Sequence, residues 1–120
     1  MLSGHVKHGA KLGRTIGCPT ANVQLAQYHY ALSGVFVVEA EGAFGKKRGV
    51  ASFGFNPTVS ASHRQKLEVH VFDFEGDLYG QRLNVRFLHK LRDEEKFDSI
   101  DALQAQIWAD MDAARHWVAA

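Results

Sequence analysis

Short segments in which apolar and polar residues alternate, each closed by turn residues, run through most of this chain and leave few folds open to it. In residues 82–91, Leu83 and Val85 alternate with Asn84 and Arg86. A period of two gives a β-strand one apolar face. Five further segments read as strands between turn residues: residues 4–8, 20–25, 34–41, 49–55 and 67–74. Six short strands at regular spacing predict a closed antiparallel barrel or a sandwich.

The end of the chain has a different period. Its apolar residues recur at spacings of three and four, which places them on one helix face: Ile100, Leu103, Ile107, Met111, Ala114 and Val118. Asp98 or Ser99 can supply the N-cap oxygen, and Asp101 suits the positive end of the helix dipole. We therefore expect a helix over residues 100–118 that buries a stripe centred on Leu103, Ile107 and Met111.

Composition narrows the class of protein. The chain has 120 residues, 14 basic and 13 acidic, for a formal net charge of +1, which gives no indication of a nucleic-acid or membrane partner. Cys18 is the only cysteine, so an intrachain disulfide and a cysteine-rich zinc site are excluded. No apolar run approaches the ~20 residues that span a bilayer, and the N-terminal segment lacks a signal peptide's apolar stretch. These features predict a single domain over residues 1–120, in the cytoplasm.

Residues 9–22, GAKLGRTIGCPTAN, are the most informative stretch for chemistry. Glycines allow a loop to bring backbone N–H groups close to a ligand, and Lys11 and Arg14 add positive charge, so the loop could hold phosphates. The pattern is neither GxxxxGK[ST] nor GxGxxG. A glycine-rich surface loop with solvated cations would have the same composition, and the segment alone does not separate the two readings.

Thr20 and Asn22 follow that loop. On a strand they project from the same face, and a hydroxyl beside an amide oxygen is a pair of hard ligands suited to Mg²⁺ together with nucleotide phosphates. The alternative is that both side chains only satisfy hydrogen bonds of a turn.

Glu68 is the candidate general base. Leu67, Val69 and Val71 form the apolar face of its segment, and Glu68 lies on the other face. A carboxylate there could accept the proton of an attacking hydroxyl, although a glutamate on the wet face of a half-buried strand is commonplace. The seven histidines show no metal-ligand spacing. We read Lys46, Lys47 and Arg48 as a solvated hairpin turn.

Four features in this order and spacing resemble the riboflavin kinase family: HGAKLGRTIGCPTAN, GVASFGFNPT, LEVHVFDFEGDLYGQRLNVRFLHKLRDEEKFDS and the closing helix. The resemblance runs from about residue 3 to residue 114. PTAN, the glutamate strand followed by DLYG, and LRxExxF are specific in combination. This chain departs from the family at Cys18, a position where family members usually have a bulky apolar residue.

The resemblance implies a six-stranded antiparallel Greek-key barrel with a C-terminal helix, which converts riboflavin and ATP to FMN and ADP with Mg²⁺. It makes Glu68 the catalytic base, Thr20 and Asn22 the metal ligands, and Arg92 and Phe97 flavin contacts. It assigns ATP and phosphate binding to Gly9, Lys11, Gly13, Arg14, Gly17, Pro19, Thr20 and Asn22. In many bacterial members an FAD synthetase domain precedes this module in a longer chain.

Two other classes of function stay open on the sequence. One is a flavin- or nucleotide-binding module that keeps the barrel without turnover. The other is an oligonucleotide-binding barrel that stacks bases on its aromatic side chains, against which the near-zero net charge argues.

Overall fold

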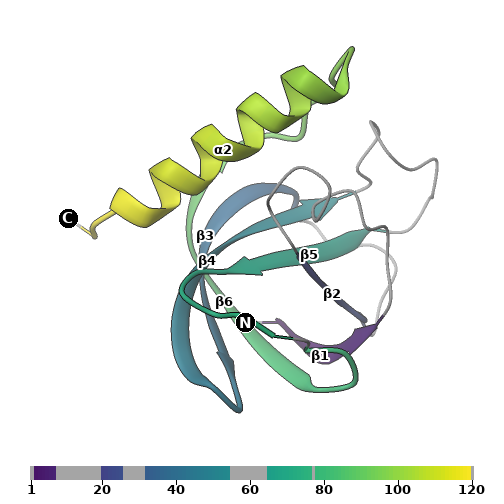
Figure 1. Cartoon of the computed structure of the whole chain (residues 1–120), viewed down its shortest axis with the longest axis vertical. Helices are drawn as coiled ribbons and strands as arrows, with labels where there is room; N and C mark the ends of the chain where they lie inside the picture. Colours follow the sequence, from purple (N-terminus) through teal and green to yellow (C-terminus); the bar gives the residue numbers. More distant parts are fainter. Residues whose placement is uncertain (1, 8–19, 26–31, 55–64, 77, 120) are drawn as a thin grey trace.

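The computed structural model describes residues 2–7, 20–25, 32–54, 65–76 and 78–119. Six strands close an antiparallel barrel in the order β1-β2-β5-β4-β3-β6, and one helix lies along its side (Figure 1). The elements are β1 (Leu2–Lys7), β2 (Ala21–Val23), β3 (Gly34–Gly42), β4 (Gly45–Gly54), β5 (Lys66–Val71), β6 (Arg82–Arg92) and α2 (Ile100–His116). The barrel and its helix are confirmed, and closure of the sheet decides against a sandwich.

The interior of the barrel is filled by the apolar residues of the alternating segments. Phe53, Leu67, Leu83 and Val85 are among its fully buried side chains. Since successive side chains of a strand point to opposite faces, each of these residues fixes its neighbours on the outside. Inward packing therefore positions the polar residues of the outer face.

A second apolar cluster lies outside the barrel, between the sheet and helix α2. It consists of Val35, Val37, Val50, Phe72 and Ala114, with Met111 and Trp117 packed against it. Val35 to Val38 of β3 are all buried, because one face of the strand lines the barrel and the other is covered by the helix. An apolar run without alternation is typical of a strand covered on both faces.

Helix α2 begins as expected and ends earlier. The Ser99 side chain accepts a hydrogen bond from the Ala102 backbone N–H at 3.1 Å, and Asp101 lies in the first turn. The helix ends at His116, so the expectation that Val118 belongs to it is wrong, and Val118 is 80% exposed. Trp117 leaves the helix in an extended conformation and packs on the second cluster instead.

The buried stripe of the helix is rotated from the expected one. Leu103, Asp110 and Ala114 are buried, Ile107 and Met111 are half-buried, and Ile100 is 47% exposed. The burial of Leu103 and the packing of Met111 on the second cluster are confirmed, whereas Ile107 as the buried centre of the stripe is wrong. The buried face of the helix includes Asp110, which forms an ion pair with Arg92 of β6, described below.

Arg48 also departs from the sequence-based expectation. It belongs to β4, half-buried, while the turn lies at residues 43–44. Its guanidinium donates a hydrogen bond to the Trp117 carbonyl and lies 5.6 Å from the centre of the Trp117 ring. The reading of Arg48 as a solvated turn residue is wrong, because the C-terminal end of the chain packs over it.

No helix in the described part of the chain is long and apolar enough to cross a membrane.

The rotated stripe gives a stability prediction. Leu103→Ala should lower the free energy of unfolding by about 2–5 kcal/mol, the range for emptying a buried leucine site. Ile107→Ala should cost clearly less, because its side chain is half-buried and its replacement leaves a smaller cavity. Urea unfolding of the two variants beside the parent measures both losses. Equal losses would contradict the burial pattern.

Candidate functional site

Three polar side chains form one row across the outer face of the barrel. β2 lies between β1 and β5 (Figure 1), and Asn22 is directly opposite Glu68. On the other side of Glu68, β4 places Ser52 opposite it. Opposed residues of an antiparallel pair share a face, with Cβ atoms about 4.5–5.5 Å apart. The row therefore runs Asn22, Glu68, Ser52.

The inner face holds this row in place. Ala21 and Val23 flank Asn22 in β2, and Leu67 and Val69 flank Glu68 in β5; all four belong to the barrel core. A slip of one residue in either strand would bring the polar side chain into the interior. The apolar neighbours in the sequence are thus the reason that Asn22 and Glu68 face outward together.

Thr20 joins the row from the residue before β2. Its hydroxyl donates a hydrogen bond to Glu68 Oε2 at 3.4 Å, in a part-buried position. Thr20 and Asn22, selected from the sequence as a same-face pair, thus meet the carboxylate selected independently as a base. This convergence requires β2 and β5 to be neighbours, which no spacing in the sequence discloses.

Asn22 carries an unsatisfied oxygen. The residue is 8% exposed, and its Oδ1 is the one buried side-chain nitrogen or oxygen of the described residues without a hydrogen-bond partner. An unpaired buried polar group costs about 1–3 kcal/mol, which makes the Asn22 oxygen a candidate contact for a ligand. An amide oxygen, a nearby hydroxyl and a carboxylate are hard donors, and this donor set fits Mg²⁺.

The protein groups alone do not form a metal cage. Within the described segments, no cluster of three or more His, Cys, Asp or Glu side chains could hold a metal ion. A divalent ion held by Thr20 and Asn22 would take its other ligands from phosphates and water, which is the usual arrangement for Mg²⁺.

The rest of the predicted phosphate site falls on residues outside those described. This applies to the loop residues Gly9, Lys11, Gly13, Arg14 and Gly17, and to Cys18 and Pro19. Their assignment to ATP and phosphate stays a prediction.

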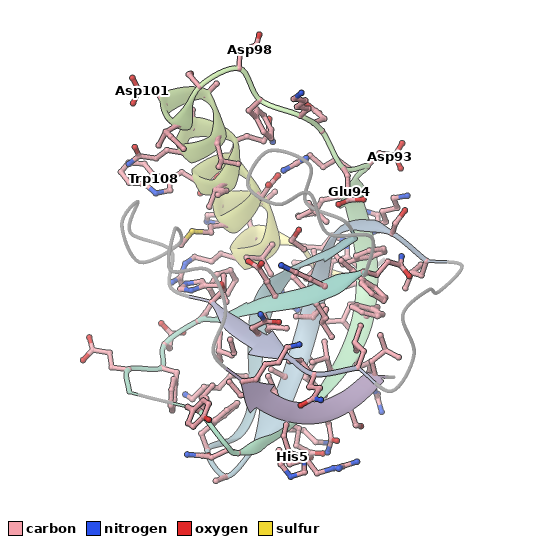
Figure 2. The ribbon with its side chains drawn as sticks, turned by 90° about the vertical axis from the view of Figure 1, so that its right-hand side faces the viewer. His5, Asp93, Glu94, Asp98, Asp101 and Trp108 are labelled. Atoms are coloured by element: carbon pink, nitrogen blue, oxygen red, sulfur yellow. The ribbon has the colours of Figure 1, made fainter. Side chains whose placement is uncertain are left out.

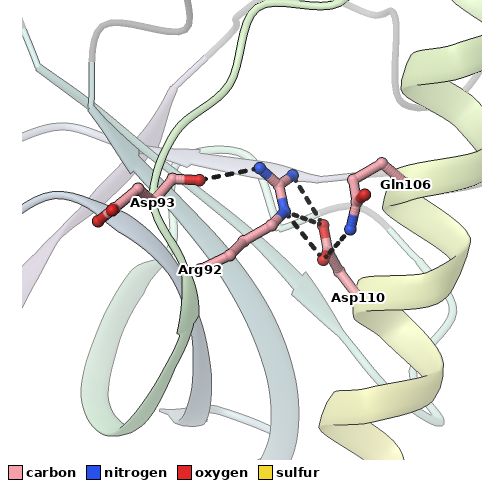
Figure 3. A network of polar contacts seen from close by, with 4 residues as sticks. All are labelled: Arg92, Asp93, Gln106 and Asp110. Carbon is pink, nitrogen blue, oxygen red and sulfur yellow. Dashed lines mark hydrogen bonds and ion pairs between the residues drawn. The ribbon is translucent and has the colours of Figure 1, made fainter.

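Arg92 is engaged by the helix. Its Nε and Nη2 donate to the Asp110 carboxylate at 2.9 to 3.2 Å, and Gln106 donates to the same carboxylate at 3.0 Å (Figure 3). The side chains of Arg92 and Asp110 are only 17% and 8% exposed. The guanidinium also lies 5.6 Å from the centre of the Phe97 ring. Arg92 and Phe97 thus lie together, with the arginine charge neutralised by Asp110.

Sequence reasoning missed Asp110, although a signal was present. Asp110 lies three residues after Ile107 and four before Ala114, so it falls on the apolar stripe. A charged residue at such a position needs a buried partner. The candidates were the cations at the end of the last predicted strand, of which Arg92 is one.

The segment between β6 and the helix crosses the end of β4. A Cβ atom on Gly54 would lie 2.1–2.2 Å from the Glu94 carboxylate atoms, so this carboxylate lies directly over the Gly54 backbone. Asp93, beside Glu94 where the chain leaves β6 (Figure 2), is exposed and accepts from Lys90 at 2.5 Å. The hydrogen bond and charge of Lys90 lower the pKa of the Asp93 carboxyl below its usual value. Glu94 lies close to the β4 end of the polar row, whereas Asp93 forms its ion pair with Lys90 of β6.

Comparison with known proteins places this geometry in a family. The Flavokinase family model, described as riboflavin kinase, matches residues 1–118. A bifunctional riboflavin kinase/FMN adenylyltransferase of Pseudomonas fluorescens is 47% identical over 114 residues, which cover 95% of this chain and 37% of that protein. The chain therefore spans little more than a third of this curated relative.

Two solved structures share the fold. A Streptococcus pneumoniae protein described as a macrolide-efflux protein is 40% identical with a TM-score of 0.82, and the match covers 98% of this chain and 38% of that one. Riboflavin kinase from Trypanosoma brucei is 26% identical with a TM-score of 0.63, covering 95% and 76%.

The ion pair between Arg92 and Asp110 gives the prediction of this section. Asp110→Ala should lower the free energy of unfolding by about 3–5 kcal/mol, because it leaves a buried guanidinium unpaired. Replacing both partners, with Arg92→Met and Asp110→Leu, should cost much less. As a control, Asp93→Ala should have little effect, since water screens the exposed pair with Lys90. Urea unfolding compares the variants, and a double variant as unstable as Asp110→Ala would contradict the assignment.

Proposed function

This chain belongs to the riboflavin kinase family, and from that premise we propose that it transfers the γ-phosphoryl group of ATP to the ribityl 5′-hydroxyl of riboflavin, giving FMN and ADP. The observation that carries the proposal is the convergence of Thr20, Asn22 and Glu68 on one patch of the barrel. Phosphoryl transfer depends mostly on positioning and charge neutralisation. A strand pair that holds a carboxylate beside two oxygen donors supplies the positioning, and a divalent ion held by those donors would supply the charge neutralisation.

Glu68 acts as the general base. A base must lie within hydrogen-bond reach of the proton it takes, and Glu68 stands at the centre of the row with neighbours on both sides. The Thr20 hydroxyl donates to one of its oxygens, which helps to fix the carboxylate while the other oxygen faces the acceptor hydroxyl.

The nucleotide lies on the β2 side of Glu68. Thr20 and Asn22 would hold Mg²⁺, which neutralises the charge of the transferring phosphoryl group when it is bound. The glycines and cations of the preceding loop would cover the phosphates: Gly9, Lys11, Gly13, Arg14, Gly17 and Pro19.

The flavin lies on the side of the helix. Phe97 contacts the flavin ring system. The Arg92 guanidinium packs against the Phe97 ring, and its charge is neutralised by Asp110. Arg92 thus acts on the flavin by holding the segment that leads from β6 to helix α2.

The module has a place in a longer protein. Relatives such as the Pseudomonas fluorescens protein combine riboflavin kinase with FMN adenylyltransferase, and this chain matches only 37% of that length. We propose that this chain is the kinase domain of such an arrangement, that it works in the cytoplasm, and that an adenylyltransferase domain consumes its FMN.

The test of the proposed function is the formation of FMN from riboflavin, ATP and Mg²⁺, separated by chromatography. Glu68→Gln keeps the size of the side chain but removes its basic oxygen, so the rate should fall roughly 10²–10⁴-fold, while riboflavin and ATP binding change far less. Glu75→Gln, at an exposed position, is the matched control and should keep the parent rate. A Glu68→Gln variant as fast as the parent would exclude Glu68 as the base.

The unsatisfied oxygen of Asn22 gives a second prediction. Asn22→Leu removes a buried unpaired polar group, so it should raise the free energy of unfolding by about 1–3 kcal/mol. The same change removes a proposed metal ligand and should abolish FMN formation at ordinary Mg²⁺ concentrations. Thermal unfolding and the FMN assay, run on one preparation, measure both effects. Loss of stability together with activity would show that Asn22 is a structural residue.

A further inference from the structure

Ser52 is the part of the polar row that the proposed chemistry leaves unused. It lies directly opposite Glu68, on the side away from Asn22. The residue is half-buried, and its hydroxyl is one strand away from the Glu68 carboxylate. Neighbouring strands are separated by about 4.8 Å.

The in-line geometry of phosphoryl transfer indicates on which side of Glu68 the acceptor hydroxyl lies. The attacking and leaving oxygens stand roughly in line on opposite sides of phosphorus. Because the phosphate ligands Thr20 and Asn22 lie on the β2 side of Glu68, the acceptor hydroxyl approaches from the β4 side. The remainder of the acceptor then extends over β4, where Ser52 is the first side chain it meets.

On β4 itself, the surroundings of Ser52 are apolar, and the nearest polar group beyond it is the Glu94 carboxylate over Gly54. The partner of Ser52 on β3 is Val35, which is 5% exposed in the cluster under helix α2. Along the outer face of β4, Val50 is 7% exposed in the same cluster, and Gly54 has no side chain. Between Val50 and Gly54, Ser52 is therefore the only polar side chain on the outer face of β4.

We propose that Ser52 recognises the polyol chain of the acceptor, through a hydrogen bond between its hydroxyl and the acceptor hydroxyl next to the one that is phosphorylated. This assignment rests on the proposed function, in which that neighbour is the 4′-hydroxyl of riboflavin. A serine hydroxyl both donates and accepts, as does each hydroxyl of a polyol, so the two groups match without any charge. The contact distinguishes a polyol from an acceptor with a single terminal alcohol.

A substrate and enzyme cycle tests the contact. The kcat/KM for phosphorylation is measured for the parent and Ser52→Ala, each with riboflavin and with an analogue that lacks only the 4′-hydroxyl. Loss of a neutral hydrogen bond of about 0.5–1.5 kcal/mol corresponds to roughly a two- to twelvefold decrease. Ser52→Ala should show this decrease with riboflavin and no further decrease with the analogue.

Two variants control the experiment. Ser52→Thr keeps the hydroxyl on a strand that tolerates β-branching, and should retain most of the parent kcat/KM with riboflavin. Ser3→Ala removes a serine hydroxyl that donates to Asn84 at 2.7 Å, away from this row, and should decrease kcat/KM with neither substrate.

The outcomes separate the two proposals. Equal losses on both substrates, or no loss with riboflavin, would refute the role of Ser52 while the parent still forms FMN. A folded parent that forms no FMN would refute the proposed function, and with it the assignment of Ser52. Loss restricted to the substrate that carries the 4′-hydroxyl, with activity kept in Ser52→Thr, would establish the contact.

Discussion

The pairing of β2 with β5 is the interaction on which the rest of the site depends. β2 has three residues, Ala21–Val23, too short to be stable alone, and it is held between β1 and β5. Its inner residues pack against those of β5 in the barrel core. This packing defines the register, and the register places Asn22 opposite Glu68. Side chains 46 positions apart in sequence thereby become neighbours without any direct bond between them being required.

The outer surface of the barrel has two regions with different tasks. Where helix α2 covers the sheet the outward residues are apolar: Val35 and Val37 of β3 and Val50 of β4. Over β2 and β5 they are polar and form the row. The boundary lies between Val35 and Ser52, which oppose each other. The buried pair of Arg92 and Asp110 fixes the helix at this boundary. Such a pair adds little net stability compared with apolar packing, but only one rotation of the helix satisfies both charges, so the pair sets that rotation.

The sequence alone predicts most of the strands, because each strand signals itself by local alternation. Residues 34–41 and 82–91 were placed within one residue of β3 and β6. The errors arise where a distant contact overrides the local pattern. The sequence around Arg48 is typical of a turn, but Trp117 packs over its side chain in the structure. The buried stripe of the helix differs from the predicted one because Asp110 is buried in an ion pair with Arg92. Thr20, Asn22 and Glu68 could be selected one by one as residue types suited to the chemistry. Their proximity could not be predicted, since it follows from which strands pair, and Ser52 became a candidate only through that pairing.

The buried polar side chains of the described residues differ in whether the protein itself satisfies their hydrogen bonds. There are three of them: Asn22, Gln65 and Asp110. Gln65 donates to the Leu32 carbonyl at 2.9 Å, and Asp110 accepts from Arg92 and Gln106. Both are satisfied within the protein, as buried polar groups usually are. The Oδ1 of Asn22 is not. Folding would favour an apolar residue at this position, because an unpaired oxygen only destabilises the protein that carries it. This contrast supports the proposal that Asn22 binds a ligand, whose binding would offset the cost of its unpaired oxygen.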